Sequence, residues 1–378
     1  MRILRVSYRV PPEPGGKERH VDRLTREQLR RGHEVTVACR RGTPPPGASR
    51  LRLRPTVTSR ALAAASDVLA FAAEVARAMP GGGRYDLVHL HGDHVEASLL
   101  GRACRRLGVP LVLTVHGALA RGHRRYARIG LRGVAACIAL GSRPARELAG
   151  CGVDPRRITV MSSGVDLAEI ARVPVPPARE PGLIVSVGSL DPVKNHALLI
   201  AAVRGLRRTR PHLRLVVAGG GPEHGRLRAL AGADPAVELP GPLPREEVYR
   251  LLRAAEVFVL ASRRLPGKGE GVPTAALEAL ALGTPVVLSG EASLEPVVPA
   301  GDVYRTFDAE SLPDLVRVLG DVLADERARE RMAALGPPAV AALDWPLVAA
   351  RVESCYHAVL GGDRAAAGAA PAGWGGAR

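Results

Sequence analysis

The sequence predicts an α/β protein made of two doubly wound, Rossmann-like domains that face each other across a cleft. Short apolar runs suited to buried parallel strands alternate with helical segments along most of the chain. The alternation stops at the proline-rich segment 172–182 and starts again at residue 183. A length of 378 residues is ample for two domains, each with its own core.

The first predicted domain spans residues 1–172. Apolar runs bounded by turn residues predict its strands at 1–7, 34–38, 86–90, 110–115, 136–140 and 157–161. The intervening segments predict helices near 17–31, 61–78, 94–107 and 142–149. In the first of these helices, Val21, Leu24 and Leu29 contribute to the apolar face.

The second predicted domain spans residues 183–345 and follows a linker at 173–182, which is too rich in proline for a helix or a strand. Its strands are expected at 183–190, 213–218, 236–239, 257–260 and 285–288. Its helices are expected near 195–206, 222–231, 245–254, 274–282 and 311–334. A last helix at 346–360 is expected to pack back on the first domain, and the Gly/Ala-rich tail 361–378 to be disordered.

The chain is strongly basic, with a formal net charge of +16. Only three of its 53 basic residues are lysine, so the charge reflects either an anionic partner or the arginine-rich coding of a GC-rich bacterial genome. Arginines gather at 102–106 and 121–132, where they could recruit an anionic lipid carrier or a membrane surface, or simply form solvated helix faces. No nucleic-acid-binding motif is visible.

Five scattered cysteines without a C-x-x-C pair argue against a disulfide framework and against a cysteine-ligated zinc. No apolar run is long enough to cross a bilayer, and no signal peptide is visible. We therefore expect a cytoplasmic protein, with peripheral contact at the inner membrane face as an option.

Two loops carry residues suited to an anionic ligand. Gly15 and Gly16 lie just before a helix, where they allow close approach of a ligand to free backbone N–H groups. Lys194 follows a strand and precedes a helix, which is a suitable place for a point charge that binds phosphate. A plain tight turn and a solvated lysine are the alternatives.

The segment 267–289 is the most informative in the chain. Glu270 precedes a Gly–Val–Pro–Thr loop, and Glu278 lies on an otherwise apolar helix. A carboxylate in apolar surroundings needs partners, which sugar hydroxyls can supply, although an arginine could do the same. The loop N–H groups at 271–275 would face the phosphates of such a ligand.

Several motifs, in order over about residues 1–360, resemble those of retaining, nucleotide-sugar-dependent glycosyltransferases of the GT-B fold and the family 4 type. They are "GGKERHV", "RGHEVTV", "TVHG" at 114–117, "SSGVD" at 162–166, "VGSLDPVKN" at 186–195, "AGGGP" at 218–222, and Glu270-x7-Glu278 followed by "GTPVV". The resemblance implies a transfer of a hexose-type sugar from a nucleotide diphosphate, most simply UDP, to an acceptor hydroxyl with retention of configuration. It implies neither a metal nor another cofactor.

The same resemblance implies roles for individual residues. His116 would touch the donor sugar near the reacting carbon, Glu270 would contact the sugar ring, and Lys194 would neutralise the diphosphate. Glu278 would bind the ribose hydroxyls. The donor phosphates would meet backbone groups of three loops, which comprise Gly15, Gly16, Ser189, Gly271, Val272, Pro273 and Thr274.

Two positions depart from the family pattern. Ser189 stands where the family usually has an arginine, five residues before the lysine, so Arg263 or Arg264 would have to supply the second cation. Ser163 stands where an asparagine usually precedes Gly–Val–Asp. These departures keep open the possibility of a nucleotide-sugar-binding protein without turnover.

A competing interpretation comes from "VHLHGDHVE" at 88–96, where His89, His91, Asp93 and His94 have the spacing of a zinc hydrolase. In the transferase interpretation, His91 or Asp93 instead faces the acceptor. A GT-B epimerase is a further alternative, whereas a phosphorylase would need a cofactor-binding lysine that is hard to find. The acceptor itself, lipid-linked or a small polyol or aglycone, is not defined by the sequence.

Overall fold

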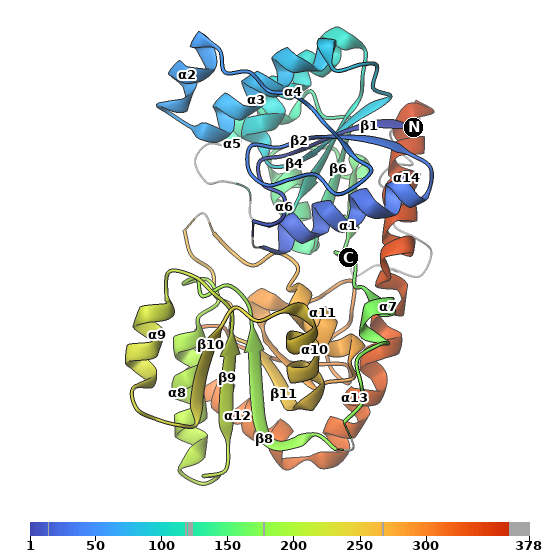
Figure 1. Cartoon of the computed structure of the whole chain (residues 1–378). Helices are drawn as coiled ribbons and strands as arrows, with labels where there is room; N and C mark the ends of the chain where they lie inside the picture. The colour runs from blue at the N-terminus through green and yellow to red at the C-terminus, as the bar shows by residue number, and fades with distance from the viewer. Residues whose placement is uncertain (14, 118, 120–123, 177, 267, 363–378) are drawn as a thin grey trace. The chain divides into compact units, whose positions relative to one another are not determined.

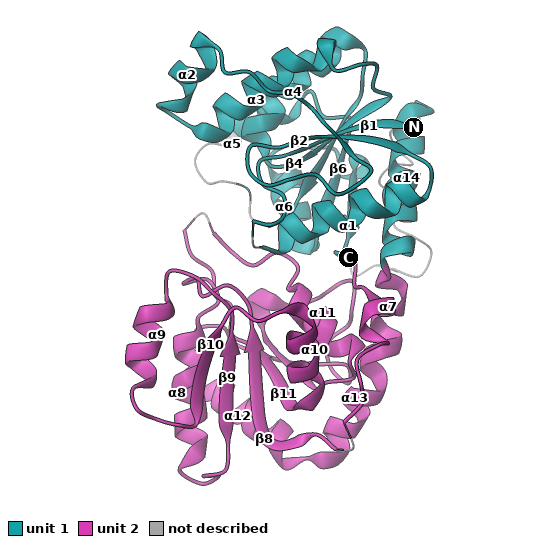
Figure 2. Cartoon of the chain, in the orientation of Figure 1, with its two compact units in different colours: residues 1–163, 345–378 teal, residues 164–344 magenta. Residues whose placement is uncertain are grey.

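The computed structural model describes residues 1–13, 15–117, 119, 124–176, 178–266 and 268–362 (Figure 1). The chain forms two compact units (Figure 2). Unit 1 comprises Met1–Ser163 and Trp345–Arg378, and unit 2 comprises Gly164–Asp344. The boundary therefore lies before the predicted one at 172, and the segment 173–182 belongs to unit 2.

Unit 1 contains a seven-stranded parallel sheet in the order β3-β2-β1-β4-β5-β6-β7. The strands are β1 (Arg2–Ser7), β2 (Glu34–Ala38), β3 (Ser49–Arg50), β4 (Leu87–His91), β5 (Leu111–Val115), β6 (Ala136–Leu140) and β7 (Ile158–Met161). Strands β4, β5 and β6 are buried along their whole length, as expected for a sheet covered by helices on both faces. The short strand β3 was not predicted.

The helices of unit 1 are α1 (Gly16–Arg30), α2 (Val57–Ala63), α3 (Asp67–Ala78), α4 (His94–Leu107), α5 (Arg124–Leu131), α6 (Ser142–Gly150) and α14 (Trp345–Leu360). The predicted helix 61–78 is in fact two helices, because the hydroxyl of Ser66 accepts a hydrogen bond from the Leu69 N–H and starts a new helix. Helix α14 lies against α1. There the Arg31 guanidinium donates to the Glu353 carboxylate at 2.8 Å.

Unit 2 contains a six-stranded parallel sheet in the order β10-β9-β8-β11-β12-β13. The strands are β8 (Glu180–Val187), β9 (Arg214–Ala218), β10 (Val237–Gly241), β11 (Ala255–Leu260), β12 (Val286–Ser289) and β13 (Arg305–Phe307). The helices are α7 (Leu167–Ile170), α8 (His196–Arg207), α9 (His224–Ala231), α10 (Arg245–Ala254), α11 (Thr274–Ala281), α12 (Leu312–Ala324) and α13 (Glu326–Val340). Short 3-10 turns occur at Met79–Gly81, Pro155–Arg157, Gly290–Ala292 and Ala341–Leu343.

Two predictions for unit 2 are wrong in detail. Strand β8 begins at Glu180, inside the predicted linker, because Pro181 falls where the pairing with β11 is irregular and needs no regular ladder bond. The predicted helix 311–334 is divided at Asp325, whose carboxylate accepts from the Ala328 N–H at 2.9 Å and caps α13. The tail 363–378 lies outside the described residues.

The strand orders locate the sites where ligands bind in such sheets. The order reverses between β1 and β4 in unit 1, and between β8 and β11 in unit 2. Loops leaving two adjacent strands in opposite directions open a crevice at the carboxyl ends of those strands. No helix in the described part of the chain is long and apolar enough to cross a bilayer.

Candidate functional site

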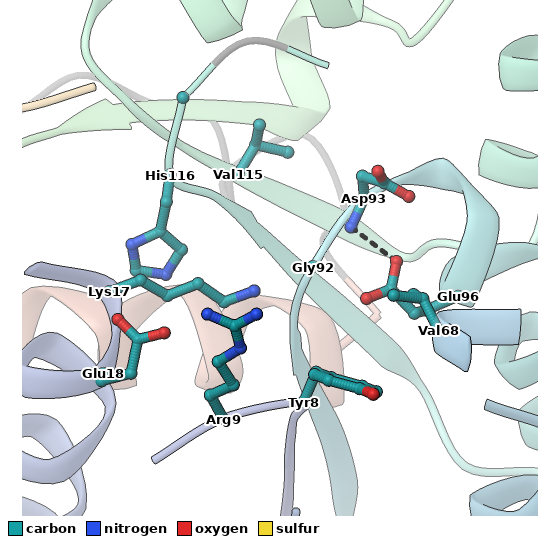
Figure 3. Close-up of a pocket in the computed structure, with 11 residues that line it drawn as sticks. Tyr8, Arg9, Lys17, Glu18, Val68, Gly92, Asp93, Glu96, Val115 and His116 are labelled. Atoms are coloured by element: carbon teal, nitrogen blue, oxygen red, sulfur yellow. Dashed lines mark hydrogen bonds between the residues drawn. The ribbon is translucent and has the colours of Figure 1, made fainter. Parts of the chain in front are cut away.

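A pocket of about 360 Å³ lies at the point in unit 1 where the strand order reverses (Figure 3). Its walls come from the loops after β1, β4 and β5, from the first turns of α1 and α4, and from one residue of α3. The lining residues are Tyr8, Arg9, Lys17, Glu18, Val68, Gly92, Asp93, Glu96, Val115, His116 and Gly117. The pocket is thus built by loops and helix starts at the carboxyl edge of the sheet.

The first wall is the loop that leads into α1. Gly15 has a φ of 148°, in the left-handed region, and the Glu18 carboxylate lies where a side chain at Gly15 would be. Burial raises the pKa of Glu18. Figure 3 shows the cationic side chains of Arg9 and Lys17 reaching into the same space. The expected glycine loop is therefore present, with two cations beside it.

The second wall is the start of α4. The Asp93 carboxylate accepts from the Val95 N–H at 2.7 Å, and the Glu96 carboxylate accepts from the Asp93 N–H at 3.1 Å. This capping box satisfies the N–H groups of Asp93 and Val95. Burial, and next the nearby Asp93 charge, raise the pKa of Glu96. Asp93 therefore caps helix α4 and also lines the pocket.

His116, directly after β5, belongs to a cluster of histidines. A hydrogen bond of 3.0 Å joins His91 Nδ1 to His116 Nε2. The His20 ring lies 4.8 Å from the His116 ring, edge to face, and His20 Nδ1 is 3.0 Å from the Ser163 hydroxyl. Burial lowers the pKa of His116 and His91 well below the usual value, and that of His20 to about 3. These imidazoles are therefore neutral at physiological pH.

The zinc set expected from the spacing at 89–94 is not assembled. His94 is the first residue of α4, next to its cap Asp93, and the His89 imidazole lies between the hydroxyls of Thr114 and Tyr356 at 2.7 and 2.5 Å. A different group, His20, His91 and His116, brings one ligand atom from each residue within 4.8 Å of the others. The buried guanidinium of Arg5 contributes to lowering the pKa of His20 and His91, so its positive charge also opposes a cation there.

Unit 2 brings Lys194 and Glu270 together across the β8–β11 reversal point. The Lys194 ammonium group donates to the Glu270 carboxylate at 2.6 Å, and the Ser262 hydroxyl donates to the same oxygen at 2.5 Å. Lys194 lies at the end of the β8 loop, whereas Ser262 and Glu270 lie in the β11 loop. Two residues that the sequence placed in separate motifs thus form one ion pair.

The β8 loop is held by its neighbours. The Arg263 side chain donates from Nε to the Pro192 carbonyl at 3.0 Å, and its backbone N–H donates to the Val193 carbonyl at 2.7 Å. Gly219 has a φ of 152°, and any side chain there would collide with the Gly188 carbonyl oxygen. Ser189 is exposed in this loop. The structure thus places Arg263 beside the loop of Lys194.

Glu278 is buried on α11 and bonds to Arg245 of α10. The distance between the Glu278 carboxylate and Arg245 Nη2 is 3.2 Å, and Arg245 Nε also donates to the Tyr249 hydroxyl at 2.6 Å. The sequence left sugar hydroxyls or an arginine as partners of this carboxylate, and the structure places an arginine there. Helix α11 starts at Thr274 after Pro273, which has no side chain that could cap the free N–H groups. Gly271 and Val272 precede it and are partly exposed.

Sequence reasoning did not find Arg245, Ser262 or Arg9. Each lies outside the recognised motifs and reaches its site only through the fold. Ser262 lies in the same loop as Glu270, and Arg245 lies on the helix that precedes β11. The sequence contained a hint only for Arg245, because a buried carboxylate at Glu278 needs a partner. His20 lies inside "GGKERHV", but its contact with Ser163 spans 143 positions and has no local signal.

Comparisons with known proteins concern the family and the fold of the chain. Residues 14–169 match the family described as Glycosyltransferase Family 4, and residues 169–337 match Glycosyl transferases group 1. Glycogen synthase of Mycobacterium tuberculosis is 29% identical over 410 residues, covering 96% of each chain. D-inositol 3-phosphate glycosyltransferase of Acidothermus cellulolyticus is 31% identical over 376 residues, covering 81% of each chain.

The fold has solved counterparts. HepE of Anabaena in complex with UDP superimposes with a TM-score of 0.72 at 16% identity, covering 93% of this chain and 98% of that chain. Likeness at this identity concerns the fold, which is that of GT-B glycosyltransferases. Together with the family matches along both units, it shows that the chain belongs to the glycosyltransferases of group 1 and family 4.

Proposed function

We propose that the protein transfers a hexose-type sugar from a UDP-sugar to an acceptor hydroxyl with retention of anomeric configuration. The observation that carries the proposal is the meeting of Lys194 and Glu270 at the β8–β11 reversal point, in the same unit as the Glu278-bearing helix α11. We choose UDP as the nucleotide of the donor because HepE, which shares the fold, is bound to UDP.

The donor diphosphate is assigned to Lys194 and to backbone N–H groups. The ammonium group supplies a point charge, and the N-terminus of α11, with the loop from Gly271 to Thr274, supplies free N–H groups. Ser189 in the β8 loop and the N–H groups of Gly15 and Gly16 in unit 1 complete the phosphate contacts of the proposal. The Arg263 guanidinium, beside the β8 loop, replaces the family's usual second cation.

The sugar and the ribose are assigned to carboxylates and an imidazole. Glu270 accepts hydrogen bonds from sugar hydroxyls, and Glu278 accepts them from the ribose. Arg245 donates a hydrogen bond to the Glu278 carboxylate at 3.2 Å and so fixes its direction. His116 lies against the reacting carbon and, being neutral, adds no positive charge where the sugar becomes cationic.

The reaction then needs no metal. The bond from the anomeric carbon to the phosphate oxygen breaks, and its electron pair leaves with the diphosphate, whose charge Lys194 and the α11 N-terminus stabilise. The acceptor oxygen attacks the same face of the sugar, and its proton passes to the departing phosphate oxygen. Retention follows because the attack and the departure share one face.

The acceptor is assigned to the pocket of unit 1. Arg9 and Lys17 give it positive charge, whereas burial favours the neutral forms of Glu18 and Glu96. A small polyol that bears an anionic group fits such a pocket, and the relative from Acidothermus cellulolyticus is named for D-inositol 3-phosphate. An uncharged polyol should therefore be the poorer acceptor.

The test is a transfer assay with purified protein, UDP-glucose and a panel of acceptors that includes myo-inositol and myo-inositol 1-phosphate. The proposal expects UDP release that depends on an acceptor, and a product whose anomeric configuration, read by NMR, equals that of the donor. Inversion would contradict the assigned mechanism. Donor binding without any UDP release would favour the binding protein to which Ser189 points.

A further inference from the structure

We propose that the face of unit 1 formed by α4 and α5 docks on a bilayer of anionic phospholipids, with a lipid phosphate held in an arginine-lined pocket. The proposal makes the option of membrane contact specific and does not depend on the transferase reaction. The pocket measures about 390 Å³ and is lined by Ser98, Arg102, Arg105, Ile129, Gly130 and Arg132. Helices α4 and α5 lie side by side (Figure 1).

The pocket arises from helical spacing. Ser98, Arg102 and Arg105 follow the i, i+4, i+7 pattern and therefore share one face of α4. Arg132 directly follows the end of α5 at Leu131. The two helices thus present three guanidinium groups and one hydroxyl to a common space.

Glycines let the two helices approach closely enough to form this pocket. A Cβ at Gly130 would lie 2.5 Å from the His94 carbonyl oxygen, and one at Gly133 would lie 2.8 Å from the Cα of Gly101. Backbone packing at these positions therefore excludes larger side chains. The arginines of α4 and the end of α5 are held near one another as a consequence.

Positive charge exceeds negative charge on this face. Helices α4 and α5 together contain six arginines and one acidic residue, Glu96. Arg102, Arg105 and Arg132 are exposed, and the structure records no ion pair for them among the residues it describes. Three unpaired guanidinium groups in one pocket fit the geometry of a phosphate group, which they can bind through parallel N–H bonds.

The phosphate group bound in this pocket could belong to a lipid headgroup or to a free metabolite. Exposed apolar side chains beside the pocket favour the lipid. Ile129 in the pocket wall is 53% exposed, and Tyr126, three positions earlier on α5, is 66% exposed. Positions three apart share a helix face, whereas Ala127 and Leu131 point into the core. Aliphatic and tyrosine side chains beside arginines are typical of surfaces that lie at the membrane interface.

The test is co-sedimentation of the full chain with vesicles of phosphatidylglycerol and phosphatidylcholine, compared with vesicles of phosphatidylcholine alone. We expect binding only to the anionic vesicles, weakened by salt. The variant R102Q/R105Q/R132Q should bind roughly 100-fold more weakly, since each basic residue near an anionic surface contributes about a factor of five. Ile129→Ser should weaken binding while leaving the charge unchanged.

The matched control is R208Q/R228Q/R331Q, which removes the same charge from three exposed arginines of unit 2. It should bind vesicles like the parent protein, and circular dichroism should show that both triple variants are folded. Equal losses in the two variants would overturn the proposal, because binding would then follow net charge alone. If the protein does not bind anionic vesicles but still binds glycerol 1-phosphate in solution, the proposal of bilayer docking is wrong. The occupant of the pocket would then be a soluble phosphate metabolite.

Discussion

The ammonium group of Lys194 lies 2.6 Å from the carboxylate of Glu270, although the two residues are 76 positions apart in the chain. The β8–β11 reversal point brings them together, and the Ser262 hydroxyl fixes the same carboxylate oxygen. A lysine held in this way is positioned before a donor arrives, which reduces the cost of organising the site during the reaction.

Removal of the Lys194 charge should impair catalysis. Lys194→Ala is expected to lower kcat/KM for transfer by about 100-fold or more, the usual scale for loss of one group that stabilises transition-state charge. Lys268→Ala, an exposed lysine in the β11 loop, is the matched control and should have parent activity. Steady-state kinetics with a saturating acceptor measure both, and equal activity of the two variants would remove Lys194 from the site.

Glu278→Gln should affect both stability and donor binding. The substitution leaves the half-buried Arg245 without the Glu278 charge, so the free energy of unfolding should fall by about 1–3 kcal/mol. The donor Kd should rise at the same time. Urea unfolding and calorimetric titration with UDP measure the two effects, with the exposed Glu247→Gln on α10 as control. An unchanged Kd would place the ribose elsewhere.

His91 should act as a positioning residue for His116. His91→Ala removes the hydrogen bond to His116 Nε2, so kcat should fall about tenfold while the KM for the donor changes little. His91→Asn keeps a polar group near the position of Nδ1 and should recover part of kcat. If His91 only fills space in the core, both variants should lose stability and their kcat values should not differ from each other.

The buried histidines should make the protein sensitive to acid. The folded pKa of His20 is about 3, and those of His89, His91 and His116 are also lowered, so the unfolded chain takes up protons first as the pH falls. Stability is therefore complete above about pH 7 and decreases below about 6.5, by up to about 1.4 kcal/mol per pH unit for each histidine. Urea unfolding at pH 7.5, 6.0 and 5.0 measures the slope. His20→Gln should reduce it, and an equal slope in that variant would assign the effect to other groups.

The sequence predicted the fold well where the signal is local. Fully apolar strands such as β4 and β5 could be placed from their composition, because parallel strands buried on both faces are continuous apolar runs. Breaks inside helical segments were missed. Ser66 starts α3 shortly after α2 has ended, and Asp325 both ends α12 and starts α13; periodicity over a long window does not detect such caps.

The site was only partly predictable for a similar reason. Glu270 and Glu278 stand in one recognisable segment, and Lys194 in another, so their residue types and order were visible. Their partners depend on tertiary contacts, as Arg245 shows for Glu278. In the histidine run, the spacing suggested a zinc set with His94, whereas the fold uses the start of α4 for capping and turns His91 toward His116.

Metal-independent transfer at the site of Lys194 and Glu270 can be tested in a single assay. UDP release from UDP-glucose in the presence of an acceptor should be measured on the parent protein and on Lys194→Ala, with EDTA and with added zinc. Metal-independent transfer should give equal parent activity with and without EDTA, no gain from zinc, and loss of activity in the variant. Activity that EDTA abolishes and zinc restores, with Lys194→Ala unaffected, would contradict it and direct attention to His20, His91 and His116.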